Sequence, residues 1–115
     1  MRKLDTAWDR ARILRNREVL LLKIKEAARE TLGSNLIGVY LFGSAVTGEI
    51  IDSSDVDILI VAKGLPRSLV ERSELKERII EKSGLPLIHP FEIHLVDEDE
   101  AKIYFRHIGE KILEL

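Results

Sequence analysis

Two aspartates one residue apart, ten residues after a Gly-Ser pair, are the positions of this chain best suited to chemistry. Asp55 and Asp57 stand at the start of an apolar run, and a strand turns alternate side chains to opposite faces, so both would point the same way. Neighbouring carboxylates repel each other unless a cation lies between them, and hard divalent cations prefer oxygen ligands. Gly43 and Ser44 offer a backbone N–H and a hydroxyl, which suit a phosphate. Together these residues predict chemistry on a nucleoside triphosphate.

A third acid lies on a later apolar segment, residues 91–96. This segment alternates apolar side chains on one face with Glu92 and His94 on the other. A carboxylate on a buried strand needs a partner, because burying it unpaired is costly. If this strand neighbours the strand of Asp57, Glu92 completes a cluster of three carboxylates. Such a cluster suits two Mg²⁺ ions roughly 3.5–4 Å apart.

Each of these side chains also has a purely structural interpretation. Asp55 and Asp57 could form a polar entry to a strand, with one of them capping a turn. Ser44 could cap a helix, which is compatible with phosphate binding. Glu92 could be a salt-bridged acid on an edge strand. His94 could assist as a base or donor, or simply bond to the backbone.

The surrounding pattern predicts the elements that position these residues. A helix without internal Pro or Gly is expected over about residues 5–32, with an apolar stripe formed by Leu14, Leu21, Ile24, Ala28 and Leu32. Further elements are expected as strands at 36–42, 57–62 and 91–96, a helix that begins near Pro66 and runs to about residue 82, and a helix at 98–107. No structure is predicted for residues 108–115. This order indicates an α/β (α+β) fold, a small mixed β-sheet flanked by helices, and the direction of the first two strands stays open.

The bulk properties limit the class of protein. At 115 residues the chain is expected to form one domain, residues 1–115, with its motifs in a core of about residues 36–96. A net charge of −2 favours neither nucleic acid nor membrane as a partner. The absence of cysteine excludes disulfides and thiolate metal sites. With no apolar span or signal peptide visible, the expected location is cytoplasmic.

The combination of motifs makes the prediction more specific. A Gly-Ser turn, ten residues, Asp-x-Asp and a later acid on a strand resembles the signature of the DNA polymerase β-like nucleotidyltransferase superfamily. The closest resemblance is to its shortest branch, the minimal nucleotidyltransferases, and it covers residues from about 36 to 96.

The resemblance implies a role for each motif residue. Gly43 and Ser44 would bind the β- and γ-phosphates of a nucleoside triphosphate, with ATP expected. Asp55, Asp57 and Glu92 would be the catalytic acids and the ligands of two Mg²⁺ ions, with Mn²⁺ as an alternative. The implied reaction transfers a nucleoside monophosphate, AMP by expectation, from the triphosphate to a hydroxyl. Catalysis would come mainly from positioning and charge neutralisation.

The resemblance also implies partners. In this branch the gene often accompanies a HEPN-domain protein in a toxin–antitoxin pair, and some members transfer AMP to a tyrosine of that partner. The competing hypothesis is an antitoxin or binding module that neutralises a HEPN-type partner by contact, without catalysis. Formation of a homo-oligomer and RNA binding by the basic first helix are further hypotheses.

The chain departs from the family pattern in the turn and in its third acid. Ala45-Val46-Thr47 stands where many members carry Arg or Lys, and Glu92 stands where many carry Asp. The extra domain that larger relatives use to hold the base and the acceptor is also missing from this sequence. We therefore expect a partner to complete part of the site.

Overall fold

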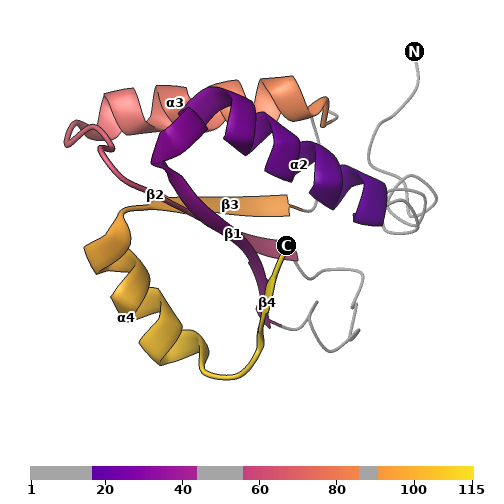
Figure 1. The fold of residues 1–115 in the computed structure, drawn as a ribbon, viewed down its shortest axis with the longest axis vertical. Helices are drawn as coiled ribbons and strands as arrows, with labels where there is room; N and C mark the ends of the chain where they lie inside the picture. The colour runs from indigo at the N-terminus through magenta and orange to yellow at the C-terminus, as the bar shows by residue number, and fades with distance from the viewer. Residues whose placement is uncertain (1–16, 44–55, 86–90) are drawn as a thin grey trace, which may run out of the picture.

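The computed structural model describes residues 17–43, 56–85 and 91–115. Within these ranges the chain forms helices and short strands (Figure 1). In chain order they are α2 (Arg17–Leu32), the short 3-10 helix η1 (Gly33–Asn35), β1 (Leu36–Phe42), β2 (Val56–Ala62), α3 (Leu69–Ser83), β3 (Phe91–Val96), α4 (Glu98–Ile108) and β4 (Ile112–Glu114). The predicted fold class, a small mixed sheet flanked by helices, is confirmed.

The sheet has four strands in the order β3-β2-β1-β4. β1 runs antiparallel to both β2 and β4, whereas β2 and β3 are parallel. A parallel pair needs a long crossover, and α3 provides it. The first two strands, β1 and β2, whose relative direction the sequence leaves open, are thus an antiparallel pair.

Helices cover the two faces of the sheet unequally. Figure 1 shows α2 and α3 on one side of the sheet and α4 on the other. Ile24 of α2 and Ile79 of α3 are fully buried against Ile58 and Ile60 of β2 in the main core. Ala101 of α4 belongs to a smaller cluster on the opposite face, formed with Leu59, Val61 and Val96.

Both faces of β2 are thus covered, as its continuous apolar sequence predicts for a central strand. Every residue of β2 is buried except Asp57, which is half-buried near its start. A carboxylate at this place in the strand must face a polar partner, because the strand around it has none to offer.

The first described helix agrees with the predicted apolar stripe. Residues 17–32 are helical, and four of the five stripe residues (Leu21, Ile24, Ala28 and Leu32) are buried in the main core. The predicted residues 5–16 of this helix, and Leu14 with them, lie outside the described part of the chain. No helix of the described residues is long and apolar enough to cross a membrane.

The start of α3 corrects one prediction. The helix begins at Leu69, not near Pro66, because Ser68 is the residue that caps it: its side chain accepts a hydrogen bond from the Glu71 backbone N–H. The Pro66 carbonyl instead accepts from Nε of Arg72. The other end matches the prediction, since Gly84 closes α3 in the left-handed conformation at φ 72°.

The C-terminal elements frame the site. α4 begins with a capping box, in which Asp97 accepts from the Glu100 N–H at 2.8 Å and Glu100 accepts from the Asp97 N–H at 3.2 Å. After α4 the chain turns at Gly109 and returns as β4, for which the sequence made no prediction. β4 pairs with β1, and Leu115 N–H donates to the Val39 carbonyl beside it.

Candidate active site

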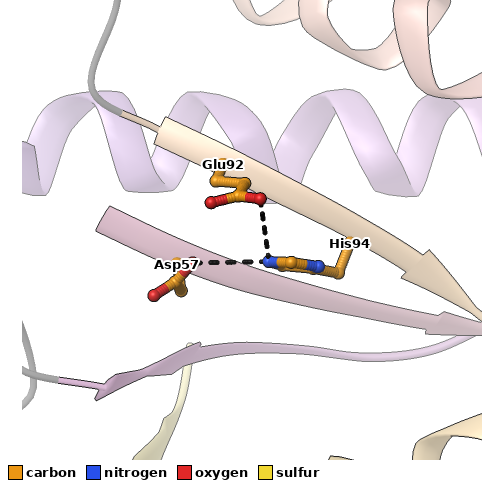
Figure 2. A group of neighbouring side chains, drawn as sticks. All are labelled: Asp57, Glu92 and His94. Atoms are coloured by element: carbon orange, nitrogen blue, oxygen red, sulfur yellow. Dashed lines mark hydrogen bonds and ion pairs between the residues drawn. The ribbon is translucent and has the colours of Figure 1, made fainter. Parts of the chain in front are cut away.

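Asp57 and Glu92 lie side by side on neighbouring strands. They are register partners in the parallel pair formed by β2 and β3. Register partners turn their side chains to the same face of a sheet, here the face that α4 covers. The neighbour relation that the sequence leaves conditional is therefore present (Figure 2).

His94 completes the group, because it lies two residues after Glu92 and points to the same face. Its Nε2 lies 3.3 Å from Oδ1 of Asp57 and 3.9 Å from Oε1 of Glu92 (Figure 2). One ligand atom from each of the three side chains fits within 4.8 Å of the others. With the proton on Nε2, His94 donates to Asp57 and holds that carboxylate in one orientation.

Residues from two further elements hold His94 in place. The Tyr104 hydroxyl of α4 lies 3.4 Å from Nδ1 of His94, and the Phe42 ring of β1 lies 5.4 Å from the imidazole. Sequence reasoning missed both residues. Their contacts depend on how α4 crosses the sheet, and the only local signal was the spacing of Ala101 and Tyr104 on one side of the helix.

The charge of the site favours a bound cation. Glu92 is about half exposed, at 54%, whereas the side chains of Asp57 and His94 are 30% and 23% exposed. Among the described residues, no Lys or Arg forms an ion pair with either carboxylate. Two neighbouring carboxylates with free oxygens and no cationic side chain match the ligand preference of a hard divalent cation. The residues present therefore fit the metal that the motif implies.

Gly43 approaches this group from the end of β1. Its φ is 82°, and a Cβ added there would lie 3.3 Å from Oδ2 of Asp57. Glycine thus permits the backbone turn and leaves room beside the carboxylate. The Gly43 N–H donates to the Lys111 carbonyl at 3.1 Å, a bond with which any phosphate would have to compete.

The remaining predicted site residues, Ser44 and Asp55, lie outside the described residues. The structure therefore brings together Asp57, Glu92 and Gly43 of the five predicted residues, and it adds His94 to them. The roles of all five in catalysis and binding stay predictions.

Comparison with known families identifies the chain's family. A family model described as polymerase beta, nucleotidyltransferase, matches residues 22–113, which include β1, β2, β3 and the first two residues of β4. The chain belongs to the polymerase β-like nucleotidyltransferases. Asp57, Glu92 and His94 all lie within the matched region.

Its curated relatives include adenylyltransferases with different acceptors. Spectinomycin 9-adenylyltransferase of Staphylococcus aureus is 37% identical over 91 residues, 75% of this chain and 33% of the relative. A candidate protein adenylyltransferase of Methanocaldococcus jannaschii is 33% identical over 61 residues, 53% of this chain and 42% of the relative. The nucleotidyltransferase thus spans about a third of the length of the spectinomycin enzyme.

Solved structures share the fold. A candidate nucleotidyltransferase from Sulfolobus solfataricus matches with a TM-score of 0.59 at 24% identity, over 99% of this chain and 89% of that one. A chain from the complex of the tri-AMPylated HEPN toxin of Shewanella oneidensis with its MNT antitoxin matches with a TM-score of 0.53 at 20% identity. The match covers 84% of this chain and 69% of that one. A chain from a toxin–antitoxin complex with AMP-PNP matches with a TM-score of 0.56 at 23% identity, over 82% of this chain and 70% of that one.

Proposed function

We propose that this nucleotidyltransferase moves AMP from ATP to a hydroxyl group with the help of a divalent metal, Mg²⁺ by preference. The observation that carries the proposal is the register pairing of Asp57 with Glu92, beside His94, on one face of the sheet. Asp57, Glu92 and, by the period of the strand, Asp55 would hold the metal. When bound, the metal would neutralise charge on the triphosphate and on the acceptor oxygen.

The chain's own residues divide the remaining work. The acceptor oxygen forms a bond to the α-phosphorus while the bond to pyrophosphate breaks. The hydroxyl proton passes to Glu92, the most exposed of the three side chains. His94 keeps Asp57 oriented, and Gly43 with Ser44 would hold the leaving phosphates.

For the acceptor, we propose a hydroxyl on a polypeptide, carried by a HEPN-type partner. The support comes from a relative named as a candidate protein adenylyltransferase and from a chain of similar fold solved in a complex with an AMPylated HEPN toxin. The spectinomycin enzymes are less informative about the acceptor, since this chain spans only 33% of their length.

A second candidate is a binding module that neutralises its partner by contact alone. Two observations favour it. The sequence after Gly43 carries Ala45-Val46-Thr47 where many family members have a basic residue, and the Gly43 N–H already donates to the Lys111 carbonyl. The lack of a basic residue and the prior use of the Gly43 N–H would each weaken the binding of a triphosphate.

Label transfer from α-labelled ATP with Mg²⁺ separates the two candidates. The acceptors are tyrosine amide and a random copolymer of glutamate and tyrosine. Wild type should label at least one of them, and Asp57→Asn should lower the rate by roughly two to three orders of magnitude. Asp99→Asn is the matched control, because Asp99 is 94% exposed on α4. Equal rates for wild type and Asp57→Asn would contradict the site, and no label on either acceptor would favour the binding module.

A further inference from the structure

The outer edge of β3 carries a groove. It has a volume of about 210 Å³, with residues 93–96 of β3 as its floor and with α3 and α4 as its walls; we call it the β3 groove. Among the described strands β3 pairs only with β2, so the groove lies along the open side of an edge strand. Pockets that enclose a whole small ligand measure roughly 300–1,000 Å³, so this groove is too small to enclose a nucleotide.

The floor of the groove is backbone. Ile93 and Leu95 point into the main core on the α3 side, whereas His94 and Val96 point to the α4 side. Successive side chains of a strand cannot all face one cavity, yet all four residues line this one. The groove therefore faces the strand edge, where an edge strand presents N–H and C=O groups that can pair with another chain.

The walls are held in position by one ion pair. Nη1 of Arg72 on α3 lies 2.7 Å from Oε1 of Glu100 on α4, across the edge of β3. Glu100 is also fixed by the capping box with Asp97, and Nε of Arg72 donates to the Pro66 carbonyl. The groove is thus formed before anything binds, which lowers the entropic cost of docking.

The charge of the groove is positive. Among the described residues that line it the only acid is Glu100, which is paired with Arg72; the Arg72 guanidinium keeps further N–H donors beyond the two that these bonds use. Lys76 lines the same wall and forms no ion pair with the described residues. An acidic side chain is the matching group in a ligand.

The groove leads into the active site. His94 lines the groove and also contacts Asp57. A strand added to β3 would lie about 4.8 Å from it, at the spacing that separates β3 from β2. The residue of the added strand that pairs with Glu92 would point to the same face of the sheet as Glu92. Asp57, which pairs with Glu92 from β2, points to that face as well.

We propose that the β3 groove docks an extended acidic segment of the acceptor polypeptide as an added strand. Backbone hydrogen bonds to β3 would give affinity, Lys76 would select an acidic side chain, and a hydroxyl side chain would reach Asp57 and Glu92. The identity of this segment as the acceptor rests on the proposed function, whereas its docking does not.

Hydrogen exchange of the full chain without nucleotide tests the docking. The probe is the glutamate–tyrosine copolymer, and the comparison probe is a lysine–tyrosine copolymer. The acidic copolymer should slow exchange of the outward-facing amides within 93–96 by about tenfold or more, since it would pair with them. Lys76→Glu should weaken this binding roughly three- to tenfold. Lys23→Glu, at an exposed position of α2, is the matched control and should bind as wild type does.

The outcomes separate this inference from the proposed function. Absence of protection at 93–96, or equal protection by the basic copolymer, overturns docking, even if tyrosine amide is labelled. Unchanged binding by Lys76→Glu overturns the charge selection. Protection that needs Lys76, with label on the acidic copolymer, supports both proposals. The same protection without label on any acceptor supports the docking and overturns the catalytic proposal.

Discussion

At the scale of single residues, Gly43 links the backbone to the chemistry of the site. Its φ of 82° lies in the region that side chains disfavour, and the place of its missing Cβ is 3.3 Å from Oδ2 of Asp57. Gly84 has a similar φ of 72° at the end of α3, with nothing within 4 Å of its missing Cβ. The two glycines therefore share the backbone demand and differ only in their surroundings.

Alanine at each position should separate these effects. We expect Gly43→Ala and Gly84→Ala to lower the free energy of unfolding by about 1–2 kcal/mol each, because both force a side chain into the left-handed region. Only Gly43→Ala should also lower label transfer, by roughly tenfold or more, since its Cβ crowds Asp57. Denaturant unfolding and the transfer assay measure the two effects. An equal fall in transfer for both variants would show that the contact with Asp57 does not matter.

The acids of the candidate site could be predicted from the sequence, but the side chains that hold His94 beside them could not. Asp57 and Glu92 stand out because a charged residue interrupts an apolar strand, which is a local signal. Their adjacency needed only the pairing of two predicted strands. Tyr104 and Phe42 contact His94 from elements whose crossing no local pattern specifies. Residue type and spacing thus predict which acids come together in the candidate site better than they predict the side chains that orient them.

At the scale of elements, the start of α4 is a junction between the fold and the β3 groove. Asp97 caps the helix, and Glu100 both completes the capping box and pairs with Arg72 of α3. The backbone N–H of Glu100, donating to the Asp97 carboxylate, holds the pKa of that carboxyl below its usual range, and the nearby Arg72 charge acts in the same direction. The charged form of Asp97 is therefore favoured by folding.

This shift predicts a pH dependence for the cap. Because the pKa of Asp97 is lower in the folded than in the unfolded chain, its contribution is complete above the unfolded value of about 3.9 and is lost as pH falls through the folded value. Asp97→Ala should lower the midpoint of thermal unfolding at pH 7, and the gap to wild type should narrow below about pH 4. Asp97→Asn should keep much of the cap without its titration, since Asn is also a good N-cap. A gap that stays constant with pH would show that the charge of Asp97 contributes nothing.

The elements that could be predicted are those with a complete local pattern. The bounds of β1 and β3 match the predicted 36–42 and 91–96, and β2 begins one residue earlier than predicted. The start of α3 was missed because Pro66 and Ser68 both offer a helix start, and only the Ser68 hydrogen bond decides between them. β4 has three residues, too few for a periodic pattern, and exists through its pairing with β1.

At the scale of the whole molecule, the sheet separates the main core on one face from the candidate site on the other. α2 and α3 fill one face with the main core, while the face under α4 holds the smaller cluster and the acidic site. A ligand that bridges Asp57 and Gly43 would connect β2 to β1 directly and stabilise the folded state as a unit.

This coupling predicts a metal-dependent stabilisation by nucleotide. ATP with Mg²⁺ at about 100 times the dissociation constant should add roughly 2.7 kcal/mol to the free energy of unfolding, a shift of the thermal midpoint on the order of 10 °C. EDTA should abolish the shift, because the carboxylates and the triphosphate repel each other without a cation. Asp57→Asn should lose it, and Asp99→Asn should keep it. A shift that survives EDTA or Asp57→Asn would place the nucleotide away from this site. The same measurement with ATP, GTP, CTP and UTP would show whether this chain recognises the base by itself. Equal shifts of the thermal midpoint would mean that the chain binds only the phosphates and leaves base selection to a partner.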